Sequence, residues 1–306
     1  DEIRRQLSRT FGEEEFFTSG MTVRSTFDPM LQGKAELALQ RGLEKYDRKQ
    51  GVWRGTGKKI PFETLNDEIN WRNLLAGLKL PRDIHLDGQW IPAVVLGIEN
   101  SELRIGIDGI KETAKGNWIP QTDITWVKKF LNSGKLVDVA AQFSDFLNIG
   151  DVVLVRKLND QDGNFLHWSL RQVSEVQGAF MAMDVNNGRI IAMQGGFSYE
   201  SSVFNRATQA KRQPGSSFKP FVYASALDSG YSPATVVVDA PIEIDTPQGL
   251  WRPKNYNEKF YGPTPLRTGI EMSRNLMTIR LAREVGLDII ANYAEKFGVY
   301  DDMQEF

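Results

Sequence analysis

The 306-residue sequence contains no cysteine and only two histidines, His85 and His167. The lack of cysteine excludes disulfide bonds and thiol catalysis. The two histidines lie in unrelated segments, which disfavours both a Ser-His-Asp triad and a metal site built on histidine. The glycine fingerprint of dinucleotide-binding folds is absent as well. We therefore expect a chemistry that uses neither a metal nor a cofactor.

The chain also lacks an excess of charge and a long apolar run. It has 37 basic and 39 acidic residues and a net charge of −2, so nothing in its charge indicates nucleic acid as a partner. No run of apolar residues is long enough to cross a bilayer, and no signal peptide is recognisable. Because the sequence starts at Asp1 without a methionine, we expect a fragment or a processed form. Its length leaves room for two domains, or for one large domain with an insertion.

Helical patterns dominate the first 89 residues. Asp28 followed by Pro29 is typical of a helix start, and apolar residues recur at helical spacing from there to about Asp47. Three further elements are expected here: a charged helix over residues 3–17, a strand over 21–27 and a short helix over 70–80.

Short β-prone runs separated by turns fill residues 90–171, which predicts a small β-barrel. Residues 147–153 are typical of an OB-type barrel. Such barrels often bind nucleic acid, but acidic residues are interleaved throughout this segment, so a protein-docking or spacer role is favoured. The predicted strands cover residues 90–98, 103–107, 124–127, 152–157 and 165–171.

A hairpin and a group of helices are predicted after the barrel. The dipeptide Asn187-Gly188 lies between two largely apolar runs, 179–183 and 189–193, which is a strong hairpin signal. Because both runs are apolar, we expect them to be central in a sheet covered by helices. Extended segments are expected around 235–244 and 251–261, and helices over 218–227, 265–272, 276–285 and 287–297.

The motif Ser-x-x-Lys occurs once, at Ser216 and Lys219, and the apolar run after it predicts a helix whose first turn carries both residues. Residues three apart on a helix share a face, so the hydroxyl and the amine should lie side by side. A neutral lysine can then remove the serine proton, provided that burial or a nearby cation lowers its pKa. The alternative is that Ser216 caps the helix and Lys219 is solvated. The aromatic-rich helix after Lys219 disfavours that alternative, since it is too apolar to be a solvated face.

Several stretches resemble the class A penicillin-binding proteins, the bifunctional cell-wall synthases, and most closely their 1a type from Gram-negative bacteria. The resemblance covers essentially the whole chain and is most specific from Phe197 onward. It implies that residues 90–171 correspond to the OB-like domain that 1a-type members insert in their transpeptidase half. The stretches that carry the resemblance are residues 21–31, 195–199, 204–208, 212–223, 251–253 and 261–275.

The resemblance implies a catalytic site made of Ser216, Lys219, Ser273 and Asn275. In this family the Ser-x-x-Lys serine is the nucleophile, and the Ser-x-Asn motif matches Ser273 and Asn275. Ser273 is suited to relay a proton between the lysine and the leaving amine, and Asn275 to hydrogen-bond the amide of the substrate. Considered without the rest of the site, Ser273 could be a turn residue and Asn275 the N-cap of the next helix.

A third family motif, Lys-Ser/Thr-Gly on a strand after Ser-x-Asn, is absent from the sequence. The similar tripeptide Arg267-Thr268-Gly269 precedes Ser273 and lies in a predicted helix start, so we reject it as this motif. The resemblance implies that the missing strand would complete the oxyanion hole and hold the substrate carboxylate. We therefore expect a chain truncated at its C-terminus, which also lacks the glycosyltransferase domain and the membrane anchor of the family.

The fold that we expect is α/β (α+β): an antiparallel transpeptidase sheet flanked by helices, interrupted by an inserted OB-like β-barrel. Residues 1–89 would be a linker and the first part of the transpeptidase domain, 90–171 the barrel, and 172–306 the rest of the transpeptidase domain.

The function implied by the resemblance is DD-transpeptidation, which cross-links peptidoglycan stem peptides through an acyl-serine. The expected partners are stem peptides ending in D-Ala-D-Ala, β-lactam antibiotics and a protein bound at the barrel. No nucleic acid is expected as a partner. Contact with a membrane is expected only through an anchor outside this chain. That anchor would place the protein on the periplasmic face of the bacterial inner membrane. Two alternatives stay open: a DD-carboxypeptidase or β-lactamase type of hydrolase, and a non-catalytic docking module.

Overall fold

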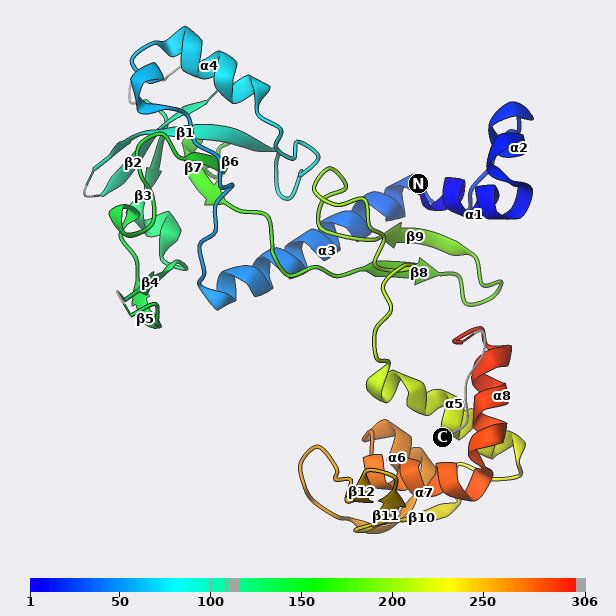
Figure 1. Cartoon of the computed structure of the whole chain (residues 1–306). Helices are drawn as coiled ribbons and strands as arrows, with labels where there is room; N and C mark the ends of the chain where they lie inside the picture. The colour runs from blue at the N-terminus through cyan, green and yellow to red at the C-terminus, as the bar shows by residue number, and fades with distance from the viewer. Residues whose placement is uncertain (100, 108, 111–115, 132, 301–306) are drawn as a thin grey trace. The chain divides into compact units, whose positions relative to one another are not determined.

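The computed structural model describes residues 1–99, 101–107, 109–110, 116–131 and 133–300 (Figure 1). The chain divides into two compact units, residues 1–210 and residues 211–306, which we call the first and the second unit. Within the described residues, no helix combines the length and the apolar character needed to cross a bilayer.

The first unit begins with three helices: α1 (Glu2–Phe11), α2 (Glu13–Thr18) and α3 (Pro29–Gln50). The single charged helix predicted over residues 3–17 is wrong, because Gly12 has a φ of 86° and interrupts it. The helix predicted from Pro29 is confirmed. The Asp28 carboxylate caps α3 by accepting the backbone N–H of Leu31 at 2.9 Å, and Gly51 ends it in the left-handed region at φ 77°.

Strands β8 (Phe180–Met183) and β9 (Ile190–Gln194) form the predicted hairpin (Figure 1). Their predicted central position is wrong: within the described residues the pair has no third strand, and most of β8 is exposed. The reason is α3. The Gln32 amide donates to the carbonyl of Met193 and accepts its N–H, both at 2.9 Å, so a helix side chain occupies the free edge of β9.

The strand predicted over residues 21–27 is also wrong. Two groups at the end of this segment reach β9: the Thr26 hydroxyl donates to the carbonyl of Ile190, and the Asp28 N–H donates to that of Ile191. These contacts do not make a ladder, and the side chains of Met21 and Val23 are exposed. The apolar alternation of this segment therefore does not face a core.

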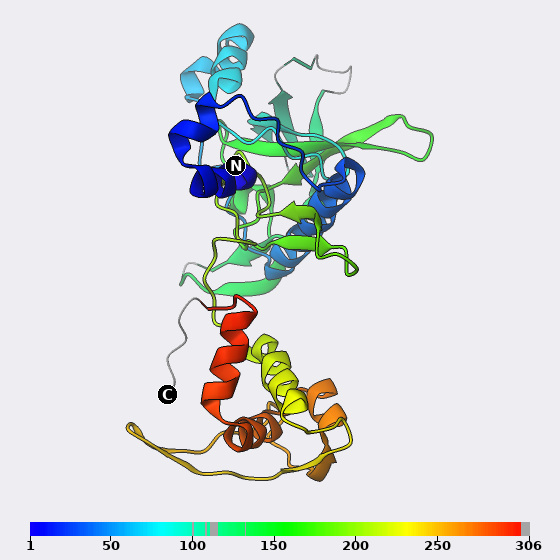
Figure 2. The ribbon, with the colours of Figure 1, turned by 90° about the vertical axis from the view of Figure 1, so that its right-hand side faces the viewer.

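Residues 90–171 contain a five-stranded antiparallel sheet in the order β3-β2-β1-β6-β7. Figure 1 labels its strands, and Figure 2 shows the ribbon from a second side. Trp168 on β7 donates its indole N–H to the side-chain oxygen of Asn117 at 3.0 Å, next to β3, so the two outer strands approach each other and the sheet closes on itself. The strands are β1 (Trp90–Ile98), β2 (Glu102–Ile107), β3 (Trp118–Pro120), β6 (Val152–Asn159) and β7 (Phe165–Arg171).

Smaller elements complete this region. The strand predicted over residues 124–127 is wrong: the Val127 N–H donates to the carbonyl of Ile124 at 2.9 Å, which makes a turn. Both side chains are buried, so the apolar run reflects a turn that faces the core. The predicted helix near residues 70–80 is confirmed as α4. The remaining elements are η1 (Phe62–Thr64), α4 (Glu68–Gly77), η2 (Gln121–Ile124), β4 (Lys128–Phe130), β5 (Leu136–Ala140) and η3 (Phe143–Asp145).

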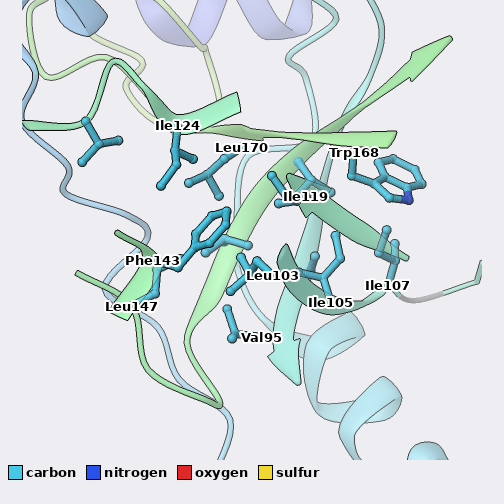
Figure 3. Close-up of a cluster of buried hydrophobic side chains, with 14 of the residues drawn as sticks. Val95, Leu103, Ile105, Ile107, Ile119, Ile124, Phe143, Leu147, Trp168 and Leu170 are labelled. Carbon is cyan, nitrogen blue, oxygen red and sulfur yellow. The ribbon is translucent and has the colours of Figure 1, made fainter. Parts of the chain in front are cut away.

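The core of this sheet is a cluster of buried aliphatic and aromatic side chains (Figure 3). Alternate residues of β2, namely Leu103, Ile105 and Ile107, point into it, as expected for a strand with one buried face. Leu170 of β7 and Phe143 of η3 cover the cluster from other sides. A closed antiparallel sheet around a single apolar core is the predicted barrel.

A second core joins this barrel to the rest of the first unit. Trp90, at the start of β1, is fully buried and lies with its ring 5.6 Å from that of Phe197. Leu43 of α3 belongs to the same cluster. The guanidinium of Arg171, at the end of β7, forms an ion pair at 3.0 Å with Glu44 of α3. The barrel therefore shares buried surface with α3, and the domain boundaries at 89/90 and 171/172 stay a prediction.

The second unit is built around three packed helices, α5 (Lys219–Asp228), α7 (Asn275–Val285) and α8 (Leu287–Lys296). They enclose a core that includes Tyr223 and Met277. The four helices predicted after residue 211 are confirmed to within a few residues. The other elements are η4 (Gly215–Phe218), β10 (Val236–Asp239), β11 (Ile244–Thr246), β12 (Gly249–Trp251), β13 (Gly262–Pro265) and α6 (Leu266–Glu271).

Candidate active site

Ser216 and Lys219 lie at the N-terminal end of α5, but not both in the α-helix. Gly215, with a φ of 54°, opens the short 3₁₀ turn η4, which carries Ser216, and α5 itself begins at Lys219 with Pro220 in its first turn. Ser216 is exposed, whereas Lys219 has 9% of its surface exposed. This arrangement leaves the hydroxyl accessible to a ligand and places the amine inside the fold.

Both residues line a pocket of about 590 Å³ in the second unit. Asn275 at the start of α7 lines it as well, so three of the four predicted site residues border one space. Trp251 of β12 and Lys254 form another part of the wall. Residues 251–253 carried part of the resemblance without an assigned role, and the sequence alone gave no signal that this loop reaches the pocket.

The Lys219 amine connects the two predicted motifs through three hydrogen bonds. It donates to the carbonyl of Ser273 at 2.6 Å, to the Ser273 hydroxyl at 3.0 Å and to the side-chain oxygen of Asn275 at 2.7 Å. Three acceptors match the three N–H bonds of an ammonium group. The structure thus brings Lys219, Ser273 and Asn275 into direct contact, and Ser216 into the same pocket.

Burial lowers the pKa of the Lys219 amine below the ordinary value of a lysine. Within the described residues no carboxylate forms an ion pair with this amine, so no anion opposes that effect at contact distance. A lysine that loses its proton more easily is suited to act as a base near neutral pH. The direction of the shift agrees with the chemistry that the motif predicts.

Ser273 lies in the tight connection between α6 and α7. Its φ is 51°, in the left-handed region that is uncommon for a residue with a side chain. The connection is held by the N–H of Ser273 on the carbonyl of Ile270 at 3.1 Å, and by that of Arg274 on the carbonyl of Gly269 at 2.9 Å. This conformation presents both the carbonyl and the hydroxyl of Ser273 to Lys219.

Asn275 is the first residue of α7, and the interpretation that it caps this helix is wrong. The N-cap position belongs to Arg274, whose side chain makes no capping hydrogen bond. The Asn275 amide is used on both sides: its nitrogen donates to the carbonyl of Lys254 at 2.9 Å, while its oxygen accepts from Lys219. One N–H and one lone pair of this amide are left for a ligand.

The tripeptide Arg267-Thr268-Gly269 lies in α6, which confirms that it is not a strand motif. Gly269 packs against the helical core: a Cβ at this position would lie 2.7 Å from the hydroxyl oxygen of Tyr223. The glycine therefore has a packing role.

The fold is that of a known class of domain. Residues 178–305 match the family model of the penicillin-binding protein transpeptidase domain. Residues 53–176 match that of the penicillin-binding protein OB-like domain. The predicted OB-like domain next to a transpeptidase domain is thereby confirmed. Its insertion into the transpeptidase half stays a prediction.

Individual relatives agree with these matches. The chain is 38% identical over 309 residues to penicillin-binding protein 1A of Rickettsia bellii, and 37% identical over 299 residues to that of Vibrio cholerae. These alignments cover 100% and 96% of this chain but 35% of either relative, so the chain spans about a third of the length of these relatives. The crystal structure of penicillin-binding protein 1A from Haemophilus influenzae superposes with a TM-score of 0.72 at 30% identity, covering 97% of this chain and 40% of that one. The chain belongs to the penicillin-binding protein family, as a homologue of the proteins named 1A.

Proposed function

We propose that the second unit performs serine acyl transfer on peptidoglycan stem peptides, as a DD-transpeptidase. The strongest support is a set of contacts: the Lys219 amine hydrogen-bonds Ser273 and Asn275, and Lys219 lines the same pocket as Ser216. A nucleophile, a base of lowered pKa and a hydroxyl in contact with that base are the groups that such a reaction needs. All four residues lie within residues 178–305, which match the family model of the penicillin-binding protein transpeptidase domain.

In the first half-reaction, the Ser216 hydroxyl oxygen attacks the carbonyl carbon between two terminal D-alanines. The neutral Lys219 amine takes the hydroxyl proton as the new C–O bond forms. The C–N bond then breaks, and the proton passes by way of the Ser273 hydroxyl to the departing nitrogen, so that D-alanine leaves as an amine. The product is an ester of the stem peptide with Ser216.

In the second half-reaction, an amine from another stem attacks the ester carbonyl. Lys219 accepts the proton of the attacking nitrogen, directly or through Ser273, and returns one to the Ser216 oxygen as the ester bond breaks. The Asn275 amide, with one free N–H, can orient a backbone carbonyl of the donor stem. Cross-linking and restoration of Ser216 complete the cycle.

The backbone N–H of Ser216 is the oxyanion donor that we assign within this chain. A second donor would come from a strand bearing Lys-Ser/Thr-Gly, a motif that the 306 residues do not contain. Because one oxyanion donor is worth about 10²–10³ in rate, the isolated chain should react at least about 10²-fold more slowly than a protein that has this strand. Where a longer protein carries this chain, functional tests use that full-length protein.

We infer the partners and the location from the same reaction. D-Ala-D-Ala stems are the donors, and β-lactams would acylate Ser216 because their strained amide resembles this terminus. Stem peptides are cross-linked outside the inner membrane, so the unit would work on the periplasmic face. The OB-like barrel would dock a protein.

The reaction products test this proposal. Full-length protein is incubated with a stem peptide ending in D-Ala-D-Ala, with and without an acceptor amine, and the products are separated by mass. We expect D-alanine and a cross-linked peptide, and neither with the Ser216→Ala variant. Release of D-alanine with hydrolysed peptide alone would favour a carboxypeptidase. No release under any condition would leave the docking role as the better account.

A further inference from the structure

The N-terminus of α7, which carries Asn275, is capped by a residue twenty positions earlier in the chain. The side-chain oxygen of Asn255 accepts the backbone N–H groups of Asn275 at 2.8 Å and of Leu276 at 3.3 Å. These N–H groups have no partner within the helix, and the residue at the N-cap position, Arg274, supplies none. Asn255 therefore does for α7 what a local N-cap residue does for most helices.

The orientation of the Asn255 amide is fixed from its other side. Its nitrogen donates to the carboxylate of Asp239 at 2.7 Å and to the carbonyl of Lys259 at 2.9 Å. Both donors and the oxygen of this amide are thus used. Asn255 has 4% of its surface exposed and Asp239 has none, so water does not compete for these bonds.

Asp239 is paired by charge with the residue before Asn275, without a hydrogen bond: within the described residues neither its second carboxylate oxygen nor the Arg274 Nε has a hydrogen-bond partner. The guanidinium of Arg274 lies 3.9 Å from the second carboxylate oxygen of Asp239, and it stacks over the ring of Tyr261 at 3.4 Å from the ring centre. A buried carboxylate needs such partners, because an unpaired charge inside a protein is costly. The strand β10, which carries Asp239, is thereby joined to the loop of Ser273.

The same loop also fixes the side chain of Asn275. The carbonyl of Lys254, next to Asn255, accepts the Asn275 side-chain N–H at 2.9 Å, which directs the amide oxygen toward Lys219. A continuous series of hydrogen bonds thus runs from Asp239 through Asn255 and Asn275 to the Lys219 amine.

We propose that Asn255 is a positioning residue of the acyl-transfer site, with Asp239 as the group that orients it. Asn255 touches neither the reacting atoms nor the pocket wall, and acts by holding the start of α7 so that Asn275 and Ser273 meet Lys219. Only the expected effect of Asn255 on acylation rests on the proposed function. Its structural consequence, the hydrogen bonding of Lys219, is measurable without any substrate.

Asparagine is required by this arrangement, and not merely a polar residue of its size. Asn255→Asp keeps the capping oxygen, loses both N–H donors and puts a second negative charge beside Asp239. In the double variant with Asp239→Asn, position 239 carries the amide and position 255 the carboxylate. An amide N–H can then again donate to a carboxylate between these two positions. Asn255→Ala removes the cap altogether. The exposed Asn257, two residues on, bonds Tyr261 and serves as the matched control.

The first measurement is the rate constant for acylation of the full-length protein by benzylpenicillin, together with the melting temperature. A displacement of about 1 Å among reacting groups can cost about 10²-fold in rate, so we expect a 10- to 100-fold loss for Asn255→Asp. The logarithm of the acylation rate constant should recover at least about a third of its loss in the double variant. The control variant Asn257→Asp should be acylated near the parent rate. A folded Asn255→Asp variant acylated at the parent rate, or a loss that Asp239→Asn does not relieve, would overturn the proposal.

The second measurement is the titration of Lys219, followed by NMR of protein labelled at the lysine ε-carbon and assigned with Lys219→Arg. In Asn255→Ala the ammonium loses a well-placed acceptor, so its pKa should fall below that of the parent, while Asn257→Ala leaves it unchanged. An unchanged titration in folded Asn255→Ala contradicts the positioning role. If the parent protein is not acylated, the proposed function fails, and this titration still decides the role of Asn255.

Discussion

Replacement of Lys219 separates the chemistry of the site from its stability. Lys219→Ala removes the base and the three hydrogen bonds to Ser273 and Asn275. Asn275 borders the pocket, so water can enter from there and replace the amine. General base catalysis contributes about 10²–10⁴ in rate, so acylation by a fluorescent penicillin should fall by at least that factor while the melting transition is retained. Lys219→Arg should be nearly as damaging, because a guanidinium stays charged near neutral pH.

The dependence on pH gives the same prediction a second test. Burial lowers the folded-state pKa of Lys219, so the acylation rate of the parent should rise with pH up to that pKa. The unfolded chain then binds more protons than the folded one between this pKa and about 10.4, the value of a free lysine. The free energy of unfolding of the parent, relative to Lys219→Gln, should therefore rise with pH within this window and be lowest below it. Substantial labelling of Lys219→Ala, or a parent rate that is flat with pH, would refute the assignment of the base.

Three further substitutions test the structure around the site. Ser273→Gly relieves a left-handed backbone that costs about 1–2 kcal/mol, so it should leave the melting temperature equal or higher while acylation falls through loss of the relay hydroxyl; a fully active variant would contradict that role. Gly269→Ala forces a Cβ against Tyr223 and should lower the free energy of unfolding by about 1–3 kcal/mol in denaturant titration; an unchanged midpoint would show that the helix can shift. Trp90→Ala should destabilise the first unit by about 3–5 kcal/mol without changing the acylation rate, because Trp90 packs on Phe197 within the first unit and the site residues belong to the second; loss of both stability and activity would contradict this independence.

Local patterns predicted most elements of this fold. The strands β1 and β7 coincide with the predicted residues 90–98 and 165–171, and α3 starts at the predicted Pro29. Each of these signals is local, either a short β-prone run or an Asp-Pro start. Patterns of this kind are visible in the order of residues because their cause is local.

Two of the errors arise where a distant segment decides the outcome. Residues 21–27 alternate like a strand, but α3 uses its Gln32 side chain to occupy the β9 edge, and no pattern within 21–27 reveals that. Residues 90–171 look like a separable segment in the sequence. However, Trp90 shares a core with Phe197, which lies 197 − 90 = 107 residues later in the chain. Removing the barrel should therefore expose apolar surface in the first unit. The sequence alone suggests a clean excision, since none of the site residues lies in the barrel.

The candidate site was predictable as residue types and not as a geometry. Ser216 and Lys219 follow from a spacing of three, and Ser273 and Asn275 from the resemblance. The capping of α7 by Asn255 depends on a loop that folds back over twenty residues, and it has no signature in sequence.

The most direct test of the account is the position of a β-lactam adduct. Full-length protein is treated with benzylpenicillin, digested, and mapped by tandem mass spectrometry, with Ser216→Ala as the control. The account predicts a single covalent adduct on Ser216, absent from the control. An adduct on any other serine, or equal labelling of the Ser216→Ala variant, would contradict the assignment of the nucleophile and with it the site.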